Sequence, residues 1–287
     1  MQYNIIGDIH GRTCWKDIVC DNAVNVFLGD YLSQYDPSYD FEHCATNFQE
    51  IVDFAKERPE TVLLIGNHDE DHWHWRHMKH ASRFDWENAD KIFALFEENK
   101  DMFRLAYPIG DKCLATHAGV SVLWYNNVFS GSYEDCWRTN MRVTDLSAYE
   151  KTDEDDFEEI VRNKDMKPEE GHLYFFKNRW NLYTGGNLIE LEYDAKSVAT
   201  TINRLWQDDP ELFHWEKNAA NWDYCGNSES QSPLWIRPEE LIRANIFKGT
   251  DIHQIVGHTQ FKNPAIYSGI IFADILESCQ DSIGIKA

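Results

Sequence analysis

The sequence contains no long apolar run and no closely spaced pair of cysteines. No apolar stretch approaches the ~20 residues that a membrane-spanning helix needs, and no basic segment followed by an apolar one opens the chain. The seven cysteines are an odd number without a CxxC pair, which favours neither a disulfide framework nor a cysteine-zinc module. We therefore expect a reduced, cytoplasmic protein without a membrane partner.

Positive charge is also scarce. Lys and Arg number 27 against 49 Asp and Glu, which gives a formal net charge of −22. Because such a surface repels a nucleic-acid backbone, we expect no broad nucleic-acid binding. Hydrophobic residues make up 43% and charged residues 26% of the 287 positions, a balance that predicts a folded globular protein with a sizeable core.

Five short apolar segments each end in a turn, the pattern of buried strands that lead into functional loops. Between them lie stretches suited to helices, at residues 40–56 and 88–101. This alternation of strand and helix predicts an α/β fold. The expected strands are residues 3–6, 24–28, 61–65, 112–115 and 254–256.

Residues 121–233 differ from the rest of the chain. They are rich in Trp, Tyr, Asn and acidic residues, and they contain no strand that ends in a histidine. We interpret them as a large insertion or cap within a single domain that spans residues 1–287. A second small domain is the alternative, although no Pro-, Ser- or Gly-rich linker separates it at either end.

Side chains that bind metals follow the expected strands. Asp8 and His10 lie two apart, so in an extended segment both project to the same side and grip one ion. Open α/β sheets bind ligands beyond the carboxyl ends of their strands, where these turns fall. One Gly-Asp turn is a weak signal, but five polar clusters after five strands favour a functional centre. The clusters are Gly7-Asp8-Ile9-His10-Gly11-Arg12, Gly29-Asp30-Tyr31, Gly66-Asn67-His68-Asp69, Thr116-His117-Ala118-Gly119 and Gly257-His258-Thr259.

In this order the clusters resemble the signature of the calcineurin-like metallophosphoesterase superfamily, GDxHG, GDxx, GNH[DE], H and GH. The resemblance covers residues 3–121 and 233–275 and is closest to the phosphoprotein phosphatase branch, with its bacterial and bacteriophage members and the related diadenosine tetraphosphatases. It implies a four-layer α/β/β/α sandwich and a metal-dependent phosphoric ester hydrolase. Features typical of the branch are Tyr107-Pro108, Thr116-His117-Ala118-Gly119-Val120 and Leu234-Trp235-Ile236-Arg237-Pro238.

The resemblance implies two divalent metal ions and a hydroxide that bridges them. Mixed carboxylate, amide and imidazole ligands suit Mn, which we expect, and also Fe, Zn, Co or Ni. Two such ions acidify the shared water and polarise the phosphoryl oxygens for in-line attack. The implied ligands are Asp8 and His10 for the first ion, Asp30 as the bridge, and Asn67, His117 and His258 for the second ion.

The remaining implied site residues act on the substrate. His68 is expected to protonate the leaving oxygen. A phosphate group needs a cationic grip, for which Arg237 is the first candidate and Arg12 the second. A surface salt bridge accounts for either arginine almost as well.

The chain departs from the branch directly after Asp30 and Tyr31. The branch continues with VDRG, in which the Asp orients the catalytic histidine and the Arg holds phosphate, whereas this chain reads Leu32-Ser33-Gln34-Tyr35. Without that Asp, His68 loses its orienter and its charge partner, so its pKa should be lower unless another carboxylate, such as Asp36 or Asp69, takes over.

The favoured function is a dinuclear-metal-dependent phosphomonoesterase. Gln260 stands where phosphodiesterase branches carry the second His of GHxH, which favours a phosphatase. A nucleotide phosphodiesterase, a 2′,3′-cyclic or end-processing phosphatase and a dinucleoside polyphosphate hydrolase remain open. A non-catalytic scaffold is disfavoured, because no implied ligand is missing. The expected partner is a phosphate ester, whether small molecule, nucleotide or phosphoprotein.

Overall fold

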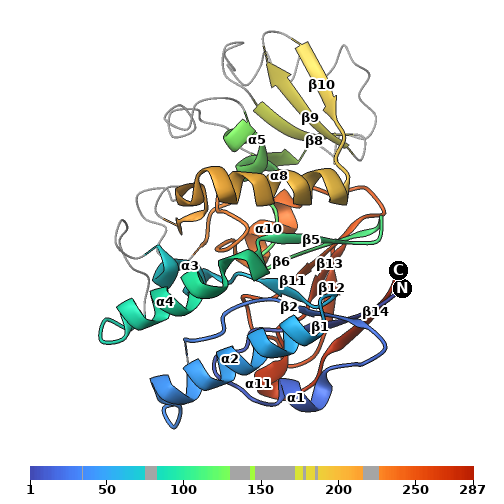
Figure 1. Ribbon diagram of the computed structural model, residues 1–287. Helices are drawn as coiled ribbons and strands as arrows, with labels where there is room; N and C mark the ends of the chain where they lie inside the picture. The colour runs from blue at the N-terminus through green and yellow to red at the C-terminus, as the bar shows by residue number, and fades with distance from the viewer. Residues whose placement is uncertain are drawn as a thin grey trace.

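Two five-stranded sheets form the centre of the protein in a computed structural model, which describes residues 1–33, 35–74, 83–129, 143–145, 172–176, 179–184, 187–215 and 226–287 (Figure 1). In the first sheet, β14 (Ile283–Lys286), β1 (Gln2–Ile6), β2 (Val24–Phe27), β3 (Val62–Leu64) and β4 (Phe103–Arg104) lie in that order. Strands β1 to β4 are parallel, and β14 is antiparallel to β1.

The second sheet has the order β12 (Ala265–Tyr267), β13 (Ile270–Phe272), β11 (His253–Val256), β6 (Cys113–Thr116) and β5 (Ala106–Ile109). Its three central strands, β13, β11 and β6, are parallel, and the two outer strands are antiparallel to their neighbours. Each sheet therefore directs the carboxyl ends of three or more strands to one edge.

The two sheets pack face to face through alternate apolar residues. Ile5, Val26 and Leu64 of the first sheet belong to one buried cluster with Ala115 and Ile255 of the second. The residues between them in each strand point the other way, toward helices. Because both faces of these strands are apolar, each sheet needs a cover on its outer side.

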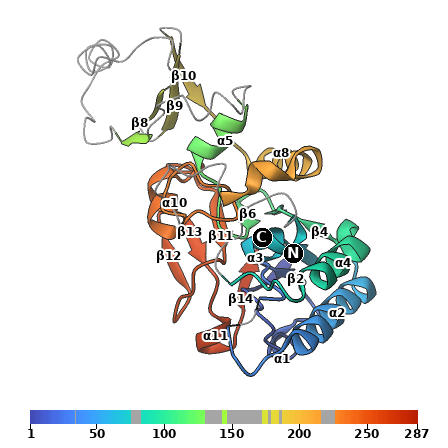
Figure 2. The ribbon, with the colours of Figure 1, turned by 90° about the vertical axis from the view of Figure 1, so that its left-hand side faces the viewer.

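Helices supply that cover on both sides (Figures 1 and 2). On the first sheet, α2 (Phe41–Glu57) and α4 (Ala89–Asn99) pack against the outward residues of β1 to β3. On the second, α10 (Pro238–Ala244) covers β11 and β13, and α8 (Ala195–Asp208) lies over β5 and β6. The expected four-layer α/β/β/α sandwich is confirmed.

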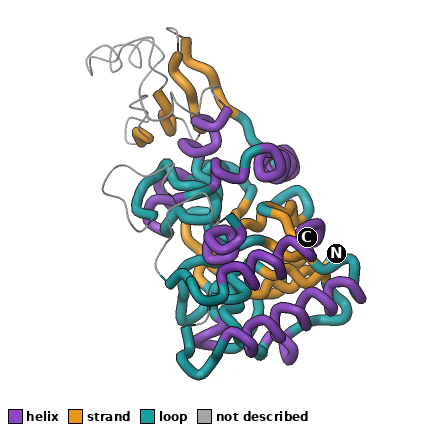
Figure 3. The backbone as a smooth tube through the Cα atoms, turned by 60° about the vertical axis from the view of Figure 1, so that its left-hand side comes forward, coloured by secondary structure: helices purple, strands orange, loops and turns teal. Residues whose placement is uncertain are grey.

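The elements expected from the sequence are found within two residues of their predicted bounds. Helix α2 begins where the Asp40 side chain accepts a hydrogen bond from the His43 N–H, a typical N-cap. Strand β14 was not predicted; its pairing with β1 brings the termini side by side, with the Met1 amino group 2.8 Å from the Ala287 carbonyl oxygen (Figure 3). The other short elements are α1 (Trp15–Ile18), α3 (Asn67–Trp73), η2 (Lys100–Met102) and α11 (Leu276–Cys279).

Parts of the region 121–233 form a third sheet away from the two central ones (Figures 1 and 2). The Trp180 indole N–H donates to the Asn245 carbonyl oxygen at 2.8 Å and so ties this sheet to the residue after α10. Whether the region 121–233 is an insertion or a second domain stays a prediction, since much of this region lies outside the described residues. Its described elements are α5 (Val122–Phe129), β7 (Val143–Asp145), β8 (His172–Phe176), β9 (Arg179–Thr184), β10 (Asn187–Leu191), α8 and η4 (Pro210–Phe213).

Among the described helices, none combines the length and the apolar character that a membrane crossing needs.

The packing between the sheets predicts a stability difference between two isoleucines. Ile5 is fully buried between the sheets, whereas Ile266 on β12 is 66% exposed. We expect Ile5→Ala to lower the free energy of unfolding by about 2–5 kcal/mol, because it leaves a cavity. Ile266→Ala is the matched control, with an expected change below about 0.5 kcal/mol. Urea unfolding measures both, and equal losses contradict the sandwich.

Candidate metal centre

The loops that follow five parallel strands meet at the seam between the two sheets. They come after β1, β2 and β3 of the first sheet and after β6 and β11 of the second. Backbone hydrogen bonds join these loops directly: the His10 N–H donates to the Asp30 carbonyl oxygen at 2.6 Å, and the Gly257 N–H to that of His117 at 2.7 Å. The sheets thus fix the positions of the polar clusters found in the sequence.

Asp8, His10 and Asp30 form a buried group whose ligand atoms all lie within 4.8 Å of one another. His10 Nε2 is 3.9 Å from Asp8 Oδ2 and 3.6 Å from Asp30 Oδ2. Two carboxylates and an imidazole at this spacing can hold a divalent cation.

Asn67, His117 and His258 form an adjoining group around one amide oxygen. Asn67 Oδ1 lies 2.8 Å from His117 Nε2 and 2.9 Å from His258 Nδ1. His117 Nε2 is also 3.5 Å from Asp30 Oδ2, so the Asp30 carboxylate lies between the two groups. The six residues implied as ligands are brought together, and their individual roles stay predictions.

The tautomers of two imidazoles fit metal binding. Nδ1 of His117 lies 2.8 Å from the Leu28 carbonyl oxygen, and Nδ1 of His10 lies against the Ser33 carbonyl oxygen. Carbonyl and amide oxygens only accept, and His117 Nε2 also faces one, Asn67 Oδ1 at 2.8 Å, whereas a neutral imidazole carries a single hydrogen. With that hydrogen on Nδ1, Nε2 of each ring presents a lone pair toward Asp30. Lone pairs that face carboxylate and amide oxygens without a proton between them need a cation. The donor set therefore fits a divalent metal ion.

Burial sets the charge states of these groups in the metal-free protein. It raises the pKa of the Asp8 and Asp30 carboxyls well above the usual value, and neighbouring carboxyls, Asp274 for Asp8 and Asp69 for Asp30, raise each further. Burial also lowers the pKa of His117 to about 3, which keeps its imidazole neutral. A cation relieves the repulsion between the carboxylates and uses the neutral imidazole as a ligand.

Three of the candidate ligands have left-handed backbones, with φ of 46° at His10, 55° at Asp30 and 62° at His258. Residues other than glycine adopt this conformation rarely, and they concentrate at functional sites. Asp8 and His10 therefore converge through a tight turn. The two side chains do come together as expected, although they follow the end of β1 at Ile6 and meet through this turn instead of along a continuous strand.

Two glycines permit the close approach of the carboxylates. A Cβ at Gly66 would lie 2.1 Å from Asp30 Oδ1, and one at Gly257 would lie 2.3 Å from Asp8 Oδ1. Any larger residue displaces a candidate ligand, which explains the glycine that precedes Asn67 and His258 in their clusters.

His68 lies beside the candidate ligands at the start of α3. Its backbone N–H donates to Asp30 Oδ1 at 2.9 Å, and its ring nitrogen Nε2 is 3.2 Å from the Tyr35 hydroxyl. The expected carboxylate partners are engaged elsewhere. Asp69 accepts the backbone N–H groups of Asp30, Tyr31 and Gly66, and Asp36 is exposed and accepts from the Ser38 N–H and hydroxyl. Neither Asp36 nor Asp69 takes over the orienting role, and the pKa of His68 is lowered to about 3, first by burial, in line with the expected loss of a charge partner.

Both candidate arginines line the cavity that contains the ligand groups, which has a volume of about 220 Å³. One Arg237 Nη lies 3.2 Å from Thr259 Oγ1 and 3.3 Å from the His258 carbonyl oxygen. Arg12 pairs with Glu277 at 2.9 Å, so a salt bridge is present beside the cavity. Gln34, at the position of the absent Arg, lies outside the described residues.

Asp274, which follows β13, was not predicted from the sequence. This carboxyl is 6% exposed, lines the same cavity and accepts the Asp8 backbone N–H. A signal was available: Ile270-Ile271-Phe272-Ala273 is an apolar run that ends in an acid, like the segment before Asp8. Tyr35 and Arg83 were missed too, and no motif marks either.

We expect substitution of Asp274 to change the affinity of the site for Mn²⁺. Asp274→Asn keeps the side-chain shape but removes a negative charge beside Asp8, so we expect Mn²⁺ to bind about tenfold more weakly. Asp281→Asn, at an exposed carboxylate, is the matched control and should bind Mn²⁺ as the unchanged protein does. Titration calorimetry measures both affinities, and an unchanged value for Asp274→Asn contradicts the electrostatic role.

Comparison with known proteins gives distant likenesses only. No family model matches the chain, and no curated protein does. One similar solved structure is a serine/threonine phosphatase from Saccharomyces cerevisiae with similarity to human phosphatase PP5. The match covers 42% of this chain and 38% of the yeast chain, with 20% sequence identity and a TM-score of 0.30. Another is a metallophosphoesterase from Sphaerobacter thermophilus, for which the match covers 74% of this chain and 96% of the other chain, with 14% sequence identity and a TM-score of 0.27. This chain thus spans well under two thirds of the first protein, and function must be argued from the site itself.

Proposed function

We propose that this protein is a dinuclear-metal-dependent phosphoester hydrolase that acts on phosphomonoesters. The observation that carries the proposal is the buried convergence of the Asp8–His10–Asp30 group with the Asn67–His117–His258 group, in which Asp30 lies between the two. Neutral imidazoles held by backbone carbonyl groups, together with crowded carboxylates, are donors that suit a pair of divalent ions.

In this proposal Asp8 and His10 hold one ion, and Asn67, His117 and His258 hold the other, with Asp30 shared. Mn²⁺ is the expected ion for such mixed oxygen and nitrogen donors. When bound, the two ions supply Lewis acidity to the phosphoryl oxygens and acidify a water molecule. The chain itself fixes the site, since Asp69 holds the backbone of Asp30 and the carbonyl groups of Leu28 and Ser33 hold the two imidazoles.

The proposed role of His68 is to give a proton to the leaving oxygen. In the metal-free protein burial lowers the pKa of His68 to about 3, so its ring is neutral there. Negative charge on a phosphate in the cavity favours the protonated ring. Arg237 and Arg12, which line the cavity, are proposed to hold the phosphoryl group through charge-assisted hydrogen bonds.

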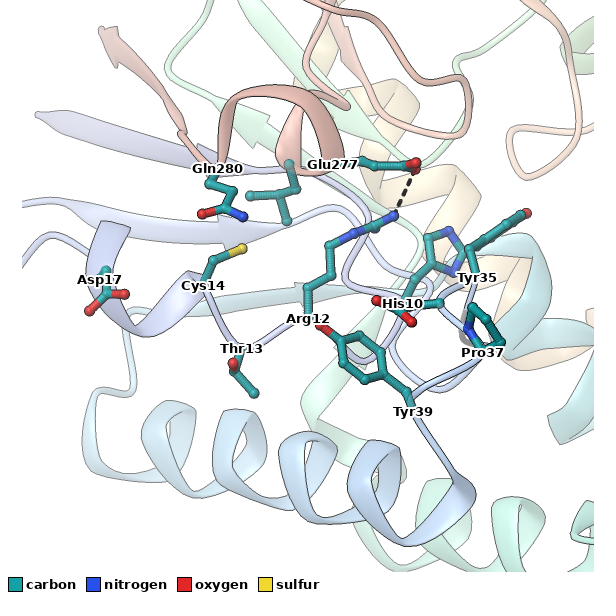
Figure 4. A pocket seen from close by; sticks show the side chains of 12 residues that line it. His10, Arg12, Thr13, Cys14, Asp17, Tyr35, Pro37, Tyr39, Glu277 and Gln280 are labelled. Carbon is teal, nitrogen blue, oxygen red and sulfur yellow. Dashed lines mark hydrogen bonds and ion pairs between the residues drawn. The ribbon is translucent and has the colours of Figure 1, made fainter.

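A larger pocket adjoins the metal cavity and suits the rest of the substrate (Figure 4). It has a volume of about 630 Å³, and His10, Arg12, Tyr35 and Glu277 line both spaces. The small cavity has room for a phosphoryl group, and the larger pocket for the group it leaves. This division supports a small molecule, a nucleotide or a phosphorylated side chain as the ester.

The first test is metal-dependent hydrolysis. With added Mn²⁺, the protein should release 4-nitrophenol from 4-nitrophenyl phosphate, and a chelator should abolish the reaction until Mn²⁺ is restored. Asp30→Asn should cost at least about a hundredfold in kcat/KM, because Asp30 touches both groups. Asp53→Asn, at an exposed carboxylate on α2, should keep full activity. Full activity in Asp30→Asn contradicts the proposed ligand roles.

The second test separates monoesters from diesters. We expect a higher kcat/KM for 4-nitrophenyl phosphate than for bis-4-nitrophenyl phosphate, since Arg237 and Arg12 favour the dianionic monoester. His68→Asn should lower kcat at least about a hundredfold on the preferred substrate. Faster turnover of the diester favours a nucleotide phosphodiesterase instead and removes the monoesterase assignment.

A further inference from the structure

We infer that Tyr35 is a positioning residue for His68. It takes the place of the carboxylate that is absent at Ser33, and it lies on the side of the site from which the leaving group departs. This inference rests on the proposed function of the same site. Ser33 occupies the position of the absent carboxylate, and its carbonyl oxygen faces His10 instead of His68. Two residues later, Tyr35 supplies the contact to the His68 ring.

Tyr35 is held on three sides at this point. Its hydroxyl is 3.2 Å from His68 Nε2, and its ring meets the His10 ring edge-on at a centroid distance of 4.3 Å. The Arg83 guanidinium carbon lies 4.1 Å from the centre of the same ring. A cation over an aromatic face and an edge-to-face ring pair both fix the plane of the phenol. The hydroxyl is therefore directed at His68 by the fold.

The contact restricts the one freedom left to His68. Its backbone is fixed by the bond to Asp30, and α3 begins immediately before it. The contact between the Tyr35 hydroxyl and His68 Nε2 then limits rotation of the imidazole ring, because the hydroxyl can donate to Nε2 of a neutral ring and accept from Nε2–H of a protonated one. An oriented imidazole is what proton transfer to a leaving oxygen requires.

Tyr35 also lies where the two cavities join. It lines the larger pocket, where Figure 4 shows it beside His10, and it also lines the metal cavity together with His68. A leaving group that extends from the metal cavity into the larger pocket passes the Tyr35–His68 pair. His68, the proposed proton donor, and Tyr35 therefore lie on the side of the phosphorus from which the leaving group departs.

The test compares two leaving groups. Phenoxide needs protonation as it departs more than 4-nitrophenoxide does. With the Mn²⁺-loaded protein we expect Tyr35→Phe to lower kcat on phenyl phosphate about tenfold or more, and on 4-nitrophenyl phosphate by less than about threefold. Tyr267→Phe, at a tyrosine that is 55% exposed on β12, is the matched control and should change neither. A purely structural role for Tyr35 lowers both rates equally, and that result overturns the inference.

A double variant tests whether Tyr35 acts through His68. Once His68→Asn has removed the imidazole, adding Tyr35→Phe should change kcat on phenyl phosphate by less than about twofold, because the two residues act as a unit. Full additivity of the two losses shows that Tyr35 acts independently, and it overturns the inference while the proposed hydrolase activity stands.

A spectroscopic readout is independent of catalysis. In the metal-free protein the ¹⁵N signals of His68 report which ring nitrogen carries the hydrogen, and Tyr35→Phe should shift them while Mn²⁺ affinity stays within about threefold. An unchanged His68 signal overturns the inference. If the unchanged protein hydrolyses neither ester, the proposed function fails, and the His68 signal alone decides whether Tyr35 positions the ring.

Discussion

The structure depends on one electrostatic constraint, the burial of several carboxyl groups at a single seam. Asp8, Asp30 and Asp274 are all at most 6% exposed, and burial raises the pKa of each carboxyl above its usual value. Neighbouring carboxyls raise it further, chiefly Asp274 for Asp8, Asp69 for Asp30 and Glu277 for Asp274. Such crowding is relieved when a cation binds between the carboxylates or when a carboxyl group takes up a proton, as the raised pKa values indicate. Gly66 and Gly257, which leave room for the carboxylates of Asp30 and Asp8, and the left-handed turns at the candidate ligands both serve to bring these groups together.

The sandwich is suited to hold this seam because its strands are fixed on both faces. The loops of the first sheet contribute Asp8, His10, Asp30 and Asn67, and those of the second contribute His117 and His258, so the Asn67–His117–His258 group needs both sheets. The His258 backbone N–H donates to Asp8 Oδ2 at 3.0 Å, so the two halves are also joined through the carboxylate itself. Rigid strand ends position ligands more accurately than free loops do, which lowers the cost of organising the site when an ion binds.

The sequence was sufficient for the features that depend on local patterns. Strands β1, β2, β3, β6 and β11 were predictable because each is a short apolar run that ends at a Gly or a Thr beside a metal-binding side chain. Asp274 carries a similar pattern but lies in no recognised motif. The partners of His68 were unpredictable for a different reason: Tyr35, Arg83 and His68 come from three separate segments, and only the tertiary fold brings them into contact. The left-handed turn at His10 likewise follows from loop geometry that residue spacing does not specify.

The candidate metal ligands and the residues that contact the substrate side of the site differ in how the fold holds them. The candidate metal ligands follow strand ends, where the hydrogen bonding of the sheets restricts every position. Tyr35 and Arg83 belong to loops that contact each other through side chains, and Arg237 precedes a helix. Loop residues can therefore change without disturbing the candidate ligands, so all six can be present while the loop after Tyr31 departs from the VDRG pattern. A neutral phenol orients the imidazole of His68 but adds no charge to the seam, whereas a further carboxylate there would add to the repulsion around Asp30. The departure at Ser33 and Tyr35 is thus compatible with the constraint on which the fold depends.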